Sequence, residues 1–164
     1  MVINKTAIYP GTFDPITNGH IDMLTKALRV FDVVILAVAS ITNKHTLFSI
    51  DERLELCKVA TIGIENIRIE KYDGLTVNFA KKMNAYTIIR GLRNGSDFEY
   101  EQQMAMVNKK LDPKIESIFL IPDEKNIFVS SSMVKHIIES GGKVKEFVPE
   151  CVEKALVNYY GFKK

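Results

Sequence analysis

The feature of this 164-residue sequence that most limits its fold is a regular alternation of short apolar runs with longer amphipathic stretches. Runs rich in Ile, Val, Phe or Tyr have the length and composition of strands, and they occupy residues 6–9, 33–39, 67–70, 87–89 and 117–121. Stretches with helical periodicity lie between and after these runs, at residues 19–30, 50–60, 76–83, 98–110, 131–139 and 149–160. The alternation predicts one α/β domain over residues 1–164, with a doubly wound five-stranded parallel sheet and helices on both faces.

A sheet of this type binds its ligands beyond the carboxyl ends of the strands, where the strand order reverses. The segments that directly follow the predicted strands are therefore the candidates for a binding site. These segments are residues 10–20, 40–48, 71–76, 90–97 and 122–131.

The composition excludes several classes of protein. A formal net charge of +2 gives no nucleic-acid footprint, and the sequence has no run of 18 apolar residues, so neither a nucleic-acid nor a membrane partner is expected. The first residues lack the pattern of a secretory signal. Cys57 and Cys151 lie far apart in apolar surroundings and are expected to be thiols in a reducing cytoplasm, with no His/Cys cluster for a structural metal.

The segment after the first predicted strand, residues 9–20, reads YPGTFDPITNGH. Its prolines, glycines and Asx residues predict a tight, fixed loop that ends at a helix start. A helix N-terminus carries unpaired N–H groups and a positive dipole end, which favour phosphate, and His20 falls in the first helical turn. A lone Gly-His pair would be a structural turn with a capping histidine, but a loop this constrained favours ligand binding.

Two later segments point to the same chemistry. Arg90 and Arg93, on either side of Gly91, present fork-shaped donors suited to phosphate oxygens. Residues 129–132, Val-Ser-Ser-Ser, open the helix predicted at 131–139. Taken alone, paired arginines are usually a solvated surface and serines at a helix start are usually N-caps.

Together these residues carry a resemblance to a known family. Residues 17–20, TNGH, resemble the Thr/His-x-Gly-His signature of the nucleotidylyltransferase superfamily. The whole string 9–20 is similar to that of the bacterial phosphopantetheine adenylyltransferases, and RGLR at 90–93 and DFEYE at 97–101 match the same family. The matches cover essentially the whole chain in order, with near-identical spacing.

The resemblance implies a Rossmann-like nucleotidylyltransferase fold. It implies transfer of the adenylyl group of ATP to 4′-phosphopantetheine, giving dephospho-coenzyme A and pyrophosphate in coenzyme A biosynthesis. It also implies Mg²⁺ as cofactor, carried with the ATP, and a homohexamer in the cytoplasm. We expect no dedicated protein ligands for the metal, because Mg²⁺ often binds through substrate phosphates and waters.

The resemblance also assigns residues. Catalysis is assigned to His20, Lys44 and Arg93. Contacts with ATP are assigned to Thr12, Phe13, His20, Gly91, Leu92, Arg93, Glu101, Asn126, Ile127, Phe128, Val129, Ser130, Ser131 and Ser132. Contacts with the acceptor are assigned to Thr12, Lys44, Thr76, Arg90, Met104 and Asn108. The chain departs from the family at Val129, where Ile is common, and at residues 126–127, where many members carry an aromatic side chain.

The chemistry of adenylyl transfer agrees with this residue set. The attacking phosphomonoester has a second pKa of about 6, is largely a dianion at neutral pH and needs no general base. Positioned cationic donors are needed instead, to bring two polyanions together and to stabilise charge on the α-phosphate and the pyrophosphate.

Several alternative functions can be compared with the sequence. A related transferase with another acceptor, such as nicotinamide mononucleotide or a phosphorylated polyol, is opposed by the strings at 90–93 and 97–101. A class I aminoacyl-tRNA synthetase would need far more chain. A non-catalytic nucleotide sensor would be expected to lose the histidine or the arginines, and it is distinguished by binding ATP without turnover.

Overall fold

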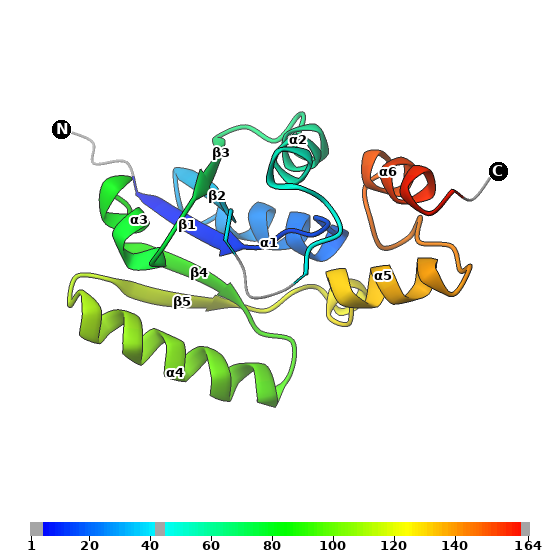
Figure 1. Ribbon diagram of the computed structural model, residues 1–164. Helices are drawn as coiled ribbons and strands as arrows, with labels where there is room; N and C mark the ends of the chain where they lie inside the picture. Colours follow the sequence, from blue (N-terminus) through cyan, green and yellow to red (C-terminus); the bar gives the residue numbers. More distant parts are fainter. Residues whose placement is uncertain (1–4, 42–44, 162–164) are drawn as a thin grey trace.

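Five parallel strands form the sheet around which the rest of the chain is arranged (Figure 1). The computed structural model describes residues 5–41 and 45–161. The strands are β1 (Thr6–Gly11), β2 (Val33–Ala39), β3 (Ile67–Tyr72), β4 (Thr87–Gly91) and β5 (Glu116–Leu120). Their order is β3-β2-β1-β4-β5, so the chain winds outwards from β1 on one side and then returns to its other side. The predicted doubly wound parallel sheet is confirmed.

Helices follow the strands along the chain. They are α1 (Asn18–Ala27), α2 (Ile50–Ala60), α3 (Thr76–Lys82), α4 (Gly95–Leu111), α5 (Ser131–Glu139) and α6 (Glu150–Tyr160), with a 3-10 turn η1 (Glu124–Asn126) before α5. Side chains of α1, α2, α5 and α6 share one core cluster on one face of the sheet, whereas α3 packs on the other face. Helices α5 and α6 extend past the carboxyl ends of the strands (Figure 1). None of the helices in the described ranges is long and apolar enough to span a membrane.

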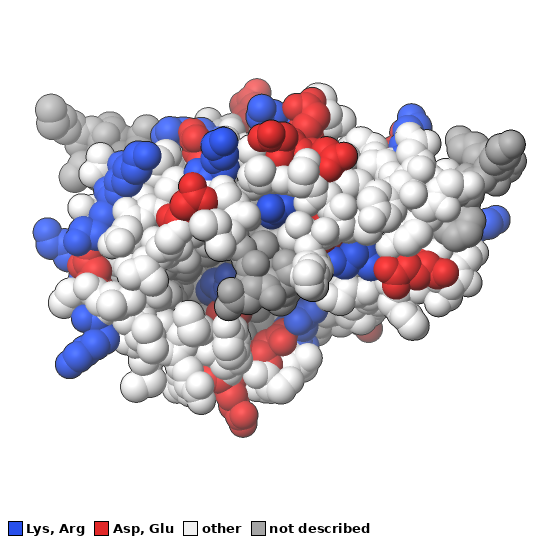
Figure 2. Space-filling view, in the orientation of Figure 1, with Lys and Arg blue, Asp and Glu red and all other residues white. Residues whose placement is uncertain are grey.

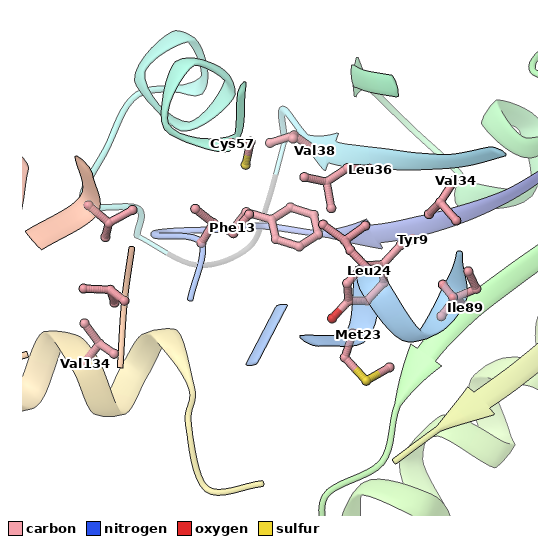
Figure 3. Packing of buried hydrophobic residues seen from close by; sticks show 14 of the residues in the cluster. Tyr9, Phe13, Met23, Leu24, Val34, Leu36, Val38, Cys57, Ile89 and Val134 are labelled. Carbon is pink, nitrogen blue, oxygen red and sulfur yellow. The ribbon is translucent and has the colours of Figure 1, made fainter. Parts of the chain in front are cut away.

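The larger core cluster explains why β2 reads as a continuous apolar run. Val34, Leu36 and Val38 point from β2 into this cluster, and Leu24 of α1 lies opposite them (Figure 3). Ile35 and Ala37, the alternate residues of the strand, face the smaller cluster on the other side. A strand covered on both faces has to be apolar at every position.

The strands β1 and β4 separate towards their carboxyl ends. Strand β1 pairs with β4 at Ala7–Thr87 and Ile8–Ile88. It pairs with β2 along its whole length, as far as Gly11. The separation opens a crevice between Pro10 and Arg90 at the point where the strand order reverses. This is the position at which doubly wound sheets bind ligands.

Proline fits inside β1 because of this separation. The carbonyl of Pro10 accepts a hydrogen bond from Nη1 of Arg90 at 3.0 Å, so it faces β4. In a strand, the N and C=O of one residue point to the same side, and the missing N–H of Pro10 therefore faces the crevice and breaks no pair. The sequence predicted that β1 ended at residue 9, and the strand continues through this proline.

The other differences from prediction concern the ends of strands and helices: β3 and β4 each run two residues further than predicted, to Tyr72 and Gly91, and β5 begins and ends one residue earlier. Helix α4 begins at Gly95, three residues earlier than expected, because the Asn94 side chain accepts the Asp97 amide and caps the helix. Helix α1 ends at Ala27, and residues 28–30 form turns. The turn η1 was not predicted.

Truncation of a fully buried β2 side chain should show how much the packing of the core contributes to stability. Leu36→Ala is expected to lower the free energy of unfolding by about 2–5 kcal/mol, since Leu36 is 0% exposed and the cavity would be lined by several elements. Denaturant titration measures the change. The matched control Ile62→Ala, at a side chain that is 79% exposed, should change the value by less than about 0.5 kcal/mol. Equal effects of the two substitutions would contradict this packing.

Candidate active site

A cleft of about 330 Å³ lies at the crevice between β1 and β4. It is lined by the end of β1 and the loop after it, the start of α1, His45 from the segment after β2, the end of β4 with the start of α4, and the start of α5. Four of the five segments that follow strands thus contribute, and the segment at residues 71–76 does not line it. Figure 2 shows basic and acidic side chains close together in the hollowed middle of this face.

His20 stands in the first turn of α1 with one ring nitrogen already engaged. Its Nδ1 accepts the Thr17 backbone N–H at 3.0 Å, and the Thr17 hydroxyl in turn accepts the His20 amide, which makes a reciprocal capping box. A neutral ring that accepts at Nδ1 carries its proton on Nε2. Burial, with a further contribution from the charge of Arg93, lowers the pKa of His20 to about 4. The ring is therefore a neutral hydrogen-bond donor at neutral pH.

Aromatic rings fix the orientation of this imidazole. The ring of Phe13 meets it edge-on at 5.0 Å between centroids, and Tyr9 lies 6.3 Å away. Phe13 has a φ of +49°, which is rare and unfavourable for a bulky residue and persists only where its surroundings hold it. Gly11 makes room for the Phe13 ring, because a Cβ there would lie 2.9 Å from Phe13 Cζ.

Gly19 brings a second backbone segment close to the start of α1. A Cβ on Gly19 would lie 3.4 Å from the Val129 carbonyl oxygen and 3.5 Å from that of Asn126. The glycine in the Gly-His pair therefore lets residues 126–129 lie directly beside the helix start. The sequence did not show why this position needs a glycine.

Two arginines of the cleft are each paired with a carboxylate. Arg90 donates from Nε and Nη2 to the two oxygens of Glu101 at 2.7 and 2.6 Å. Burial opposes the charge of Arg90, but the hydrogen bonds and charge of Glu101 outweigh it and raise the pKa of the guanidinium. Arg93 donates to Asp97 at 2.9 and 3.2 Å in a more exposed pair, and these hydrogen bonds lower the pKa of Asp97.

A third pair joins Lys135 to Asp14, with 2.9 Å between Nζ and Oδ2. The pairs differ in exposure: the Glu101 and Asp14 side chains are 10% and 4% exposed against 22% for Asp97, and the Arg90 and Lys135 side chains are 32% and 23% exposed against 40% for Arg93. An exposed pair four residues apart on the chain is weak and exchanges readily. Arg93 is thus the cation of these three that can most easily turn to a ligand.

The start of α5 supplies backbone donors to the cleft. The Ser130 hydroxyl caps the helix by accepting the Met133 amide, and the Ser131 hydroxyl donates to the Pro15 carbonyl at 2.8 Å. The first N–H groups of a helix lack intrahelical partners and carry its positive dipole end. The N-terminus of α5 therefore offers donors to an anion in this cleft, whereas in α1 the Asn18 amide donates to the Phe147 carbonyl and the His20 amide to the Thr17 hydroxyl.

Most of the residues assigned from the sequence line this one cleft. They are Thr12, Phe13, His20, Arg90, Gly91, Arg93, Glu101, Asn126, Val129, Ser130, Ser131 and Ser132. Leu92, Ile127, Phe128, Thr76, Met104 and Asn108 do not belong to its lining. Leu92 continues the pairing with β5 through Leu120, and Phe128 lines a neighbouring groove. Thr76 starts α3, while Met104 and Asn108 lie farther along α4. Lys44 falls outside the described residues.

Several lining residues were not singled out from the sequence. Tyr9, Asp14, Met23, Asp97 and Lys135 all line the cleft, and His45 does so as well although no role was assigned to it. A signal existed for Lys135, which lies four residues after Ser131 and therefore on the same helix face. No comparable signal marked Asp14, because its partners lie 33, 34 and 121 residues away along the chain.

Comparison with known proteins identifies close relatives. Residues 8–137 match the cytidylyltransferase-like family. A phosphopantetheine adenylyltransferase from Caldanaerobacter subterraneus is 51% identical over 95% of this chain and 98% of its own. The enzyme of that name from Hamiltonella defensa is 50% identical over 92% of this chain and 96% of its own. The one from Desulforudis audaxviator is 48% identical over 97% of this chain and 98% of its own.

A solved structure shares the fold at much lower identity. It is a protein from Vibrio parahaemolyticus, provisionally assigned as a nicotinate-nucleotide adenylyltransferase. The match has a TM-score of 0.70 and 16% identity, and covers 97% of this chain and 94% of the other. The predicted nucleotidylyltransferase fold is thereby confirmed.

The low pKa of His20 predicts a specific loss of stability in acid. An unfolded histidine has a pKa of about 6.5, whereas His20 in the native protein has a pKa of about 4. Between these values the unfolded chain binds the proton and the native protein does not, so the free energy of unfolding should fall as the pH drops through this range. His20→Asn should show a shallower fall, measured by denaturant titration at several pH values. A His20 ring that titrates near 6.5 by NMR would contradict the prediction.

Proposed function

The chain belongs to the cytidylyltransferase-like family and, within it, to the phosphopantetheine adenylyltransferases, and from this premise we propose how its cleft performs the reaction. The enzyme transfers the adenylyl group of ATP to 4′-phosphopantetheine, which gives dephospho-coenzyme A and pyrophosphate. The observation that carries the proposal is the neutral His20 ring, oriented as a donor at the start of α1, in the same cleft as Arg93 and the first turn of α5.

The bond changes need no general base. An oxygen of the acceptor phosphate attacks the α-phosphorus of ATP, a new P–O bond forms, and the bond to the β-phosphate oxygen breaks as pyrophosphate leaves. The acceptor phosphate has a second pKa of about 6 and is mainly a dianion at neutral pH. His20 is unsuited to take a proton, because its Nδ1 is occupied by the Thr17 amide and its pKa is low. Its role is to donate from Nε2 to the α-phosphate as charge develops there.

Arg93 and Arg90 take different roles in this proposal. Arg93 exchanges its exposed contact with Asp97 for a phosphate oxygen of ATP and so adds positive charge near the reacting phosphorus. Arg90 stays bound to Glu101 and the Pro10 carbonyl, and presents its remaining N–H groups to the acceptor phosphate. The crevice between β1 and β4 would then hold both phosphates side by side.

The β- and γ-phosphates lie against the start of α5. The first N–H groups of α5, at Ser131 and Ser132, and the ammonium of Lys135 supply donors there. The adenine lies beside Gly19 and residues 126–129, with Ile127 and Phe128 at its outer edge. The close approach of Gly19 to the Asn126 and Val129 carbonyls supports this placement, because it holds residues 126–129 beside the start of α1 at the edge of the cleft.

The acceptor is placed on the other side of the reacting phosphorus. Thr12 and Lys44 bind its phosphate, and the pantetheine arm runs from the cleft towards Thr76, Met104 and Asn108. Thr76 starts α3 at the carboxyl end of β3, and the other two follow Glu101 along α4 on one helix face.

Mg²⁺ enters with ATP in this proposal. The carboxylates of the described cleft are each paired with a cation, and the described residues contain no group of three or more His, Cys, Asp or Glu side chains suited to a metal. A cleft whose carboxylates are already paired fits a metal that is held by the substrate phosphates and by waters, with few or no protein ligands. When bound, the metal neutralises charge on the triphosphate.

The assembly is proposed to be a homohexamer in the cytoplasm. Helix α4 is 17 residues long, yet Glu101 is its one buried side chain. Its exposed apolar side chains are Phe98, Tyr100, Met104, Met106, Val107 and Leu111. A surface of this kind on a stable protein favours contact with another subunit. The cytoplasmic location is supported by the free thiols of Cys57 and Cys151.

The decisive assay for the reaction uses MgATP and 4′-phosphopantetheine with purified protein. Pyrophosphate release that requires both substrates, with dephospho-coenzyme A identified by mass, is the expected result. His20→Ala should lower kcat by about 10²–10³, the usual cost of one donor to a transition state. His136→Ala is the matched control, because His136 lies in α5 and does not line the cleft.

Two outcomes would overturn parts of this proposal. A near-normal kcat for His20→Ala would remove the catalytic role of His20. Binding of ATP without product would remove the acceptor assignment, and other phosphorylated acceptors would then be tested before a sensor role is accepted.

The assembly is tested by a charge placed on α4. Met106→Glu, at a side chain that is 68% exposed, should dissociate the hexamer with little effect on the folding of the subunit. Light scattering after size-exclusion chromatography measures the mass. Val30→Glu, at an exposed position that follows α1, is the control and should leave the mass unchanged. A hexamer that persists in Met106→Glu would show that this part of α4 is not the interface.

A further inference from the structure

The turn formed by Thr12, Phe13 and Asp14 is held on one side by a buried arginine. Arg53 of α2 is 1% exposed, and its Nη1 donates to the carbonyls of Thr12 at 2.6 Å and Ala39 at 2.9 Å. Its Nε donates to the Phe48 carbonyl at 3.3 Å. One guanidinium therefore joins the loop after β1 to the end of β2 and to the residue before the α2 cap.

A buried carboxylate holds the other side of the same turn. Asp14 is 4% exposed and accepts the amides of Leu47 and Phe48 at 2.8 and 2.9 Å. It also accepts from Lys135 Nζ at 2.9 Å. Phe48 is thus bound at its N–H by Asp14 and at its carbonyl by Arg53, and both contacts lead back to the turn.

Phe13 lies between the two held residues, and this explains its backbone conformation. A φ of +49° is unfavourable for phenylalanine and persists where the surroundings determine it more strongly than the local preference. The Thr12 carbonyl and the Asp14 side chain are fixed, so the peptide units on both sides of Phe13 cannot rotate freely. This conformation brings the Phe13 ring, which is 2% exposed, edge-on to His20.

We propose that Arg53 and Asp14 are positioning residues for His20, which act by holding Phe13 in its left-handed conformation. The Phe13 ring closes one side of the imidazole, and Thr17 holds Nδ1 from the helix start. The donor Nε2 then has one direction, into the cleft. This inference rests on the catalytic role proposed for His20.

The chemistry of Arg53 makes lysine a sharp test. A guanidinium is a planar fork that reaches several carbonyls at once, whereas an ammonium is a point charge. Arg53→Lys keeps the charge and loses the simultaneous contacts to Thr12, Ala39 and Phe48. Asp14→Asn keeps the shape and places an amide group among the donors that now surround the carboxylate.

Kinetics with both substrates at saturation give the first measurement. Arg53→Lys should lower kcat by about 10²-fold, because small misplacement of a catalytic group has effects of this size. The KM values should change little, since His20 acts on the transition state. In the His20→Ala background the same substitution should lower kcat hardly any further. The control Arg68→Lys is at an exposed position of β3 and should leave kcat unchanged. An equal loss in both backgrounds would mean a general structural role and would overturn the proposal.

The ring of His20 gives a second measurement that does not depend on activity. Nitrogen NMR of the unliganded protein should show one neutral tautomer with the proton on Nε2. Arg53→Lys and Asp14→Asn should mix the tautomers and move the pKa of His20 from about 4 towards 6.5. Asp32→Asn, at an exposed carboxylate that accepts the Lys5 amide, is the control for Asp14→Asn.

The two proposals fail in different ways. If His20→Ala keeps a normal kcat, the catalytic role of His20 fails, while the NMR spectra still decide whether Arg53 and Asp14 position its ring. If the tautomer and the pKa of His20 are unchanged in Arg53→Lys, the positioning proposal fails even when His20 is catalytic. Should Asp14→Asn not fold, Arg53→Lys carries both measurements.

Discussion

The separation of β1 from β4 beyond Ile8 and Ile88 is the constraint on which the rest of the site depends. Paired strands would fill this space with backbone hydrogen bonds. Separated strands leave the Pro10 carbonyl and the Arg90 side chain facing one another across a crevice, and Arg90 closes its floor by binding both Pro10 and Glu101. The loop after β1 and the starts of α1, α4 and α5 then surround an opening that two phosphorylated substrates could share.

The electrostatics of this cleft are balanced before any ligand arrives. The carboxylates of two cation–carboxylate pairs are well buried, whereas both partners in the pair of Arg93 with Asp97 are more exposed. His20 adds a neutral donor, since burial keeps its pKa low. A polyanion is therefore met by oriented N–H groups, the N-terminus of α5 and one readily redirected arginine. Preorganised donors of this kind stabilise a developing charge without first having to reorient.

Much of this arrangement could be predicted from the sequence, for physical reasons. Apolar periodicity reports burial, so all five strands and all six longer helices of the described residues were found, and the segments after the strands located the cleft. Contacts distant along the chain could not be found in this way. Arg53 reads as one polar residue in an amphipathic helix, and Asp14 as part of a turn, although both are buried and clamp Phe13. The proline inside β1 also depends on a separation of strands that local preference does not encode.

The central claim is that the α-phosphate of ATP meets the acceptor phosphate in the crevice between β1 and β4, against His20. A crystal structure with 4′-phosphopantetheine and a non-reactive ATP analogue tests this most directly. The account predicts that His20 Nε2 lies about 2.7–3.2 Å from an α-phosphate oxygen, with the acceptor phosphate on the far side of the phosphorus. A triphosphate bound instead in the neighbouring groove lined by Asn18, Thr25 and Arg29 would contradict it.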